Sequence, residues 1–149
     1  MHFMNTIKFV VFVSLMQTLA SCNQEEDTSD VLVQVQSHLN LAQVYMDQGQ
    51  FRASVIETQN AAQLIPNHPE TLEFIGKLYI ELGDTVSAIE NLNNALTALP
   101  DNAELKLLLG EAYLEARRPE LGLALIESLQ VGQDLEVRKN SVLGSLHAV

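Results

Sequence analysis

The chain has 149 residues, of which 19 are acidic and 8 are basic, and its formal net charge at pH 7 is −11. This length is sufficient for one modest domain with an apolar core. An acidic surface repels the phosphates of nucleic acids and the headgroups of anionic lipids. The composition therefore argues against nucleic acid as a partner and against membrane contact through the protein surface.

The first element is a short apolar run at residues 9–16, preceded by the basic residue Lys8. The run is too short to span a bilayer, which takes about 20 apolar residues. It has the length of the apolar core of a secretory signal, about 7–15 residues. The small residues Ala20 and Ser21 follow it, so we expect residues 1–21 to be a signal peptide.

The residues Leu19-Ala20-Ser21-Cys22 resemble the lipobox of bacterial lipoprotein signal peptides. In that family the chain is cleaved before the cysteine and the cysteine is acylated, which implies a lipid anchor at Cys22. In that family, an aspartate directly after the cysteine tends to keep the lipoprotein in the inner membrane. Asn23 stands there, so the resemblance implies an outer-membrane protein facing the periplasm. The alternatives are an ordinary signal peptide with a chance cysteine, or an uncleaved anchor.

The segment after the cysteine is polar and acidic, with the sequence NQEEDTSD at residues 23–30. It lacks apolar periodicity, which is typical of flexible chain. We therefore predict an acidic tether at residues 22–34.

A regular period runs through the remainder of the chain. Tyr45, Tyr79 and Tyr113 are evenly spaced and close the similar strings LAQVY, IGKLY and LGEAY. Further positions repeat in step with the tyrosines: Leu41, Ile75 and Leu109; Ala42, Gly76 and Gly110; Ser54, Ala88 and Gly122; Thr58, Leu92 and Ile126; Ala61, Ala95 and Leu129.

This pattern resembles the tetratricopeptide repeat (TPR), a helix–turn–helix unit of about 34 residues. The resemblance implies an all-α fold, a TPR-type α-solenoid of three helix–turn–helix repeats plus a C-terminal helix. The TPR domain is expected at 35–149, with repeats at about 35–68, 69–102 and 103–133 and the last helix at 134–147. Individual helices are expected at about 35–48, 51–64, 69–82, 85–98, 103–116, 119–131 and 134–147.

The turns and the C-terminus carry the remaining local predictions. Gly49 and Gly83 supply the left-handed conformation that ends a helix, whereas the third turn has Arg117 and is expected to be looser. Asp84 is predicted to cap the helix that follows it. Leu143 and Gly144 fall in the register of a fourth unit, so the last helix either caps the array or belongs to a truncated longer array.

No catalytic, cofactor-binding or metal-binding motif is found, so we predict that the protein is not an enzyme and has no cofactor. His38, His68 and His147 lack the spacing of metal ligands. The repeated tyrosines are expected to be core residues.

The first helices of stacked repeats line a concave groove in solenoids of this kind. By the register of the family, its lining here would be Gln36, Asn40, Gln43, Asp47, Glu70, Glu73, Phe74, Lys77, Glu81, Glu104, Leu108, Glu111 and Glu115. The many acidic residues favour a protein or peptide partner with basic segments, contacted also by Phe74 and Leu108. Alternatively, these glutamates are simply good solvated helix formers.

The combined features predict a non-enzymatic, lipid-anchored scaffold of the bacterial cell envelope that binds a protein in its groove. The build resembles TPR lipoproteins that support type IV pili, and the N-terminal part of long repeat lipoproteins of exopolysaccharide and exosortase systems. The alternatives are a periplasmic adaptor regulating an envelope enzyme such as a peptidoglycan hydrolase, a truncated piece of a longer TPR lipoprotein, or a structural fragment without a partner.

Overall fold

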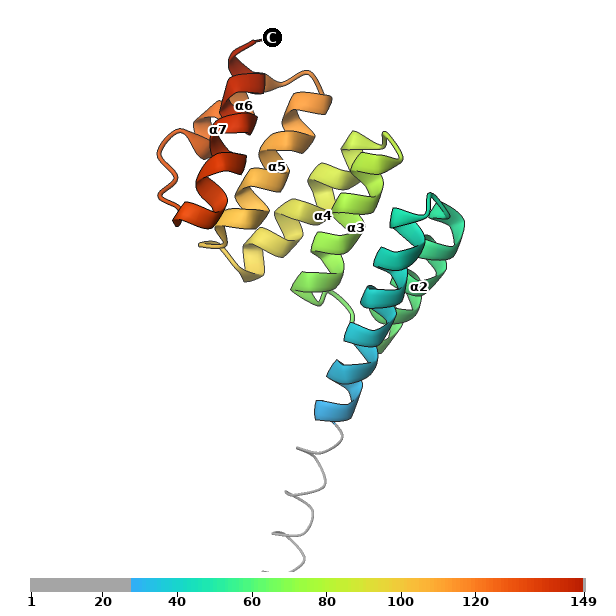
Figure 1. Ribbon diagram of the computed structural model, residues 1–149. Helices are drawn as coiled ribbons and strands as arrows, with labels where there is room; N and C mark the ends of the chain where they lie inside the picture. The colour runs from blue at the N-terminus through green and yellow to red at the C-terminus, as the bar shows by residue number, and fades with distance from the viewer. Residues whose placement is uncertain (1–27, 149) are drawn as a thin grey trace, which may run out of the picture.

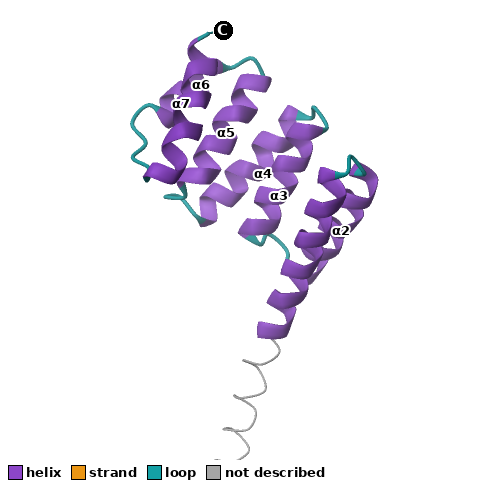
Figure 2. Cartoon of the chain, in the orientation of Figure 1, coloured by secondary structure: helices purple, strands orange, loops and turns teal. Residues whose placement is uncertain are grey.

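The computed structural model of the protein describes residues 28–148, and over this range all regular structure is α-helical, without a strand (Figure 2). This confirms the predicted all-α class. The helices are residues 28–47, called here the first helix, then α2 (Phe51–Leu64), α3 (Pro69–Glu81), α4 (Thr85–Ala98), α5 (Ala103–Glu115), α6 (Pro119–Ile126) and α7 (Gln133–His147). Successive helices run antiparallel and stack into a solenoid (Figure 1).

Helices of one pair approach closely because a small residue on one faces a large residue on the other. A side chain at Gly76 would overlap with Leu92, and one at Gly110 would overlap with Ile126. In the first pair the corresponding positions hold Ala42 and Thr58, both buried. The Thr58 hydroxyl donates to the Ser54 carbonyl at 2.8 Å, which satisfies the polar atom inside the helix.

The core consists of apolar clusters between neighbouring helices. Its central cluster joins α3, α4 and α5, with Tyr79 and Tyr113 packed against it, as predicted for these two tyrosines. A second cluster joins α5, α6 and α7 through Ile126, Val142 and Leu146. The last helix is thus attached to the third pair by apolar contact.

The three turns between paired helices share one hydrogen-bond pattern, and the expectation of a looser third turn is wrong. Gly49, Gly83 and Arg117 have φ values of 69°, 76° and 56°. Their amides donate to the carbonyls of Met46, Ile80 and Leu114 at 2.9–3.0 Å. Arg117 adopts the left-handed conformation because the same packing of two helices fixes the turn.

The first helix includes residues that we expected in the flexible tether. Residues 28–34 are helical, and the first turns extend beyond the other helices (Figure 1, blue). Val35, only 1% exposed, and Leu39 anchor this helix against Ala61 of α2 and Phe74 of α3. Once these two residues are fixed, preceding residues extend the helix without a new nucleation cost.

Helix α6 is shorter than predicted, because it ends at Ile126 and not at residue 131. Residues 127–132 form the connection to α7. The Lys139 ammonium donates to the Leu129 carbonyl at 2.6 Å, so α7 satisfies a backbone carbonyl in this connection.

Residues 1–27, with the expected signal peptide and Cys22, lie outside the described residues. Within 28–148, no helix has both the length and the apolar character needed to cross a membrane.

Candidate partner-binding groove

Two adjoining hollows lie along the helices that begin each pair, and together they are called the groove here. The N-terminal hollow, about 220 Å³, is lined by Gln36, Leu39, Asn40, Gln43, Glu70, Glu73, Phe74 and Lys77. The C-terminal hollow, about 320 Å³, is lined by Gln43, Met46, Lys77, Ile80, Glu81, Glu104, Leu108, Glu111 and Arg138. Gln43 and Lys77 border both hollows, so the groove is continuous from the first helix to α7.

The repeat period explains why these side chains align. Gln36, Glu70 and Glu104 occupy the same position of consecutive repeats, and Arg138 lies one further step along the chain. Residues with the same place in each repeat face the same side of a solenoid. At this one position, every repeat therefore contributes a polar or charged side chain to the groove.

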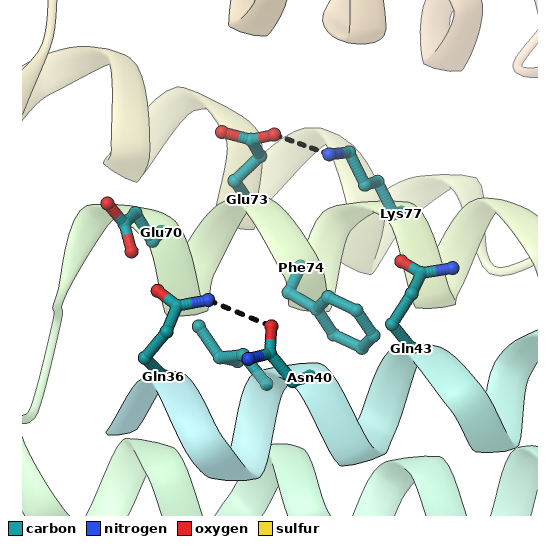
Figure 3. A pocket seen from close by; sticks show the side chains of 8 residues that line it. Gln36, Asn40, Gln43, Glu70, Glu73, Phe74 and Lys77 are labelled. Atoms are coloured by element: carbon teal, nitrogen blue, oxygen red, sulfur yellow. Dashed lines mark hydrogen bonds and ion pairs between the residues drawn. The ribbon is translucent and has the colours of Figure 1, made fainter. Parts of the chain in front are cut away.

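The N-terminal hollow combines amides, one ion pair and an apolar floor (Figure 3). The Gln36 amide donates to Asn40 Oδ1 at 3.1 Å, and Lys77 Nζ donates to Glu73 Oε1 at 2.5 Å. Phe74 is only 7% exposed and packs in the cluster of the first helix. It therefore forms the floor of the hollow and presents little surface to a ligand.

The C-terminal hollow contains a bidentate arginine–carboxylate pair. Arg138 donates from Nε and Nη2 to the two Glu111 oxygens, each at 3.0 Å, and from Nη1 to Glu104 Oε1 at 3.5 Å. The hydrogen bonds to Glu111 raise the pKa of the Arg138 guanidinium. Leu108 is 4% exposed and, like Phe74, belongs to the core.

All of the predicted groove residues line the two hollows except Asp47 and Glu115. Asp47 instead accepts a hydrogen bond from the Gln43 amide at 2.7 Å, which holds that amide beside the groove. Glu115 is the last residue of α5 and is exposed. Leu39, Met46, Ile80 and Arg138 line the groove without having been predicted.

The histidines lie apart from one another. His38 Nδ1 lies 2.7 Å from Glu57 Oε2 and joins the first helix to α2. His68 is half-buried before α3, and His147 is exposed at the end of α7. Among residues 28–148, no group of three or more His, Cys, Asp or Glu side chains is arranged to hold a metal ion.

Comparison with known proteins identifies the fold. A sequence profile of the tetratricopeptide repeat family matches residues 79–131. A mutant O-GlcNAc transferase of Thermobaculum terrenum is similar, with a TM-score of 0.71 and 22% identity over 80% of this chain and 23% of that one. A thermophilic TPR protein of Thermus thermophilus has a TM-score of 0.67 and 20% identity over 76% of this chain and 64% of that one. No curated protein matches the sequence.

The described fold is therefore a TPR-type α-solenoid, as predicted, and its residues 79–131 match the tetratricopeptide repeat family. This chain spans less than two thirds of the length of both similar structures. Solenoids of this kind typically act as interaction modules, because they present an extended concave surface to protein partners.

Proposed function

We propose that the protein is a non-enzymatic scaffold that holds an extended, basic segment of a protein partner in its groove. The main support for the proposal is the negative charge of the side chains that line the groove. Five glutamates line the two hollows, against the two cations Lys77 and Arg138. A ligand with basic side chains complements such a surface and is steered toward it.

Glu70 and Glu81 are the carboxylates best placed to receive that ligand. Within the described part of the chain they make no ion pair, whereas Glu73 is paired with Lys77 and Glu111 with Arg138. A partner's cation can therefore contact Glu70 or Glu81 without breaking an existing pair. The two residues lie at opposite ends of α3, so a bound segment would follow this helix.

Neutralising both carboxylates tests this proposal. The probe is a fluorescein-labelled dodecapeptide with arginine at every third position and serine or glycine elsewhere. The double variant Glu70→Gln/Glu81→Gln should bind it about tenfold more weakly in a fluorescence anisotropy titration, because two charge-assisted contacts are lost.

The matched control is Glu90→Gln/Glu120→Gln. It removes the same charge from exposed positions of α4 and α6, and Glu120 lies in the first turn of its helix as Glu70 does. The control should bind the probe like the unmodified protein. Equal binding by both double variants would show that the groove glutamates are solvated helix formers and not a binding surface.

For the location, we propose that an acylated Cys22 attaches the protein to the periplasmic face of the bacterial outer membrane. The support comes from the sequence: the short apolar run, the small residues before Cys22 and the absence of aspartate after it. Several acyl chains, each contributing about 0.8 kcal/mol per buried methylene, would hold the chain firmly to a bilayer.

A further inference from the structure

Arg138 is the only basic residue at its position of the repeat, because the three preceding units carry glutamine or glutamate there. Equal steps of one repeat lead from Gln36 to Glu70, to Glu104 and then to Arg138 on α7. The groove thus ends in a basic side chain that comes from the chain itself. This side chain is of the type that the proposed partner would supply.

The geometry shows that the C-terminal hollow accepts a guanidinium. Arg138 meets both oxygens of Glu111 at 3.0 Å and also reaches Glu104. This fork-to-fork arrangement is the strongest and most specific way in which a carboxylate binds arginine. The pair remains partly open to solvent, since about a third of each side chain is exposed. An arginine of a partner can therefore reach Glu111 from solvent and make the same two bonds in place of Arg138.

The half of α7 that carries Arg138 has no buried apolar residue. The buried apolar residues of α7, Val142 and Leu146, lie in the second half of the helix. In the first half, Val137 is 77% exposed and Leu135 is half-buried. The N-cap residue, Gly132, provides no side-chain cap. Apart from Arg138, only Leu135 and the bond from Lys139 to the Leu129 carbonyl hold this half within residues 28–148, and neither lies in the groove. Arg138 can therefore leave the groove while the second half of α7 stays packed on α5 and α6.

We infer that the first half of α7 is an internal competitor that occupies the C-terminal hollow through Arg138. The inference rests on the proposed function, because it assigns a regulation to the same groove. An arginine of the partner displaces Arg138 from Glu111 and Glu104, and the first half of α7 then loosens. The groove consequently binds basic segments more weakly than its carboxylates alone would allow.

The test compares Arg138→Gln with the matched control Lys139→Gln, using the arginine dodecapeptide as the probe. Both variants remove one positive charge from adjacent positions of α7. Lys139 anchors the helix to the Leu129 carbonyl and does not line the groove. Arg138→Gln should bind the probe about tenfold more tightly than the unmodified protein, whereas Lys139→Gln should stay within about twofold, because only the first frees Glu111.

Hydrogen exchange of the unmodified protein provides a second readout. Saturation with the probe should accelerate amide exchange at residues 137–144, whose helical acceptors lie at residues 133–140, and leave residues 145–147 unchanged. Equal affinities in all three chains, or a gain shared by both variants, would overturn the inference while leaving the proposed function standing. Weaker binding by Arg138→Gln would show that Arg138 is part of the receptor and would overturn it as well. No binding by any of the three chains would overturn the proposed function and, with it, the inference.

Discussion

At Arg117 the chain turns between α5 and α6 with a φ of 56°, in the left-handed region that glycine occupies at the two preceding turns. A residue with a Cβ atom costs roughly 1–2 kcal/mol in this conformation. We therefore expect Arg117→Gly to raise the free energy of unfolding by about 1 kcal/mol, measured by urea denaturation followed by circular dichroism.

The converse variant is Gly83→Ala. Gly83 has a φ of 76°, and an added Cβ would contact nothing within 4 Å. Its loss of stability would hence report conformational strain alone, again about 1 kcal/mol. If Arg117→Gly had no effect while Gly83→Ala was destabilising, contacts of the arginine side chain would have to offset the strain.

Thr58 shows what a single sequence can and cannot reveal about a residue. The sequence shows that Thr58 departs from the repeat, because the same position holds the larger apolar residues Leu92 and Ile126 in the later units. The reason becomes visible only in three dimensions. Ala42 is larger than Gly76 and Gly110, so the smaller Thr58 suits it, and its hydroxyl bonds to the Ser54 carbonyl.

At the level of elements, the start of α4 depends on a charged cap, as predicted for Asp84. Its carboxylate accepts from the Ser87 amide at 3.1 Å and from the Ser87 hydroxyl at 2.7 Å. These bonds hold the pKa of Asp84 below its ordinary value of 3.8, and the bond from the Ser87 hydroxyl has the largest effect. The folded state therefore gains stability from the ionised group above that pH and loses it as the pH falls through the lowered pKa.

We expect Asp84→Asn to lower the midpoint of thermal unfolding at pH 7 and to match the unmodified protein in strong acid, where both caps are neutral. Asn102 caps α5 by accepting from the Leu105 amide at 3.0 Å, and it provides the control. Asn102→Asp should raise the midpoint at pH 7 only, because the charge favours the helix N-terminus. A deficit of Asp84→Asn that stayed constant down to strong acid would contradict the role of the charge.

Helix interiors could be predicted from the sequence, whereas two helix ends could not. The repeat period fixes which residues pack, and this defines most of the helices. Beyond the early end of α6, the Leu129 carbonyl is bonded by Lys139 of another helix. The extension of the first helix to residue 28 depends on Val35 and Leu39, whose partners lie on α2 and α3. Neither contact is visible in a local pattern.

The groove residues of the three repeats could be predicted from the repeat register. Glu70, Glu104 and Glu111 line it because their places in the repeat face one side. Arg138 was missed because no groove position was assigned in the last helix, although one further repeat step from Glu104 leads to it. The pairing of Arg138 with Glu111 spans two helices, and no sequence period indicates it.

At the scale of the whole molecule, the proposed lipid anchor makes a direct prediction. Cys22→Ser removes the thiol that would be acylated, so the protein should move from the membrane pellet to the soluble fraction after cell fractionation. Cys22→Ala provides a second variant without a hydroxyl and should behave alike. Retention of both variants in the membrane pellet would exclude acylation at this residue as the attachment.

The extension of the first helix has a mechanical consequence for a chain held at Cys22. Residues 28–34 rise by about 1.5 Å each, which gives a rod of about 10 Å with one direction relative to the solenoid. A coil of the same length would leave residue 28 free to move around the domain, whereas the helix fixes its place relative to the concave side. Under the proposed attachment at Cys22, the anchored end of the chain would therefore always enter the solenoid from the same direction.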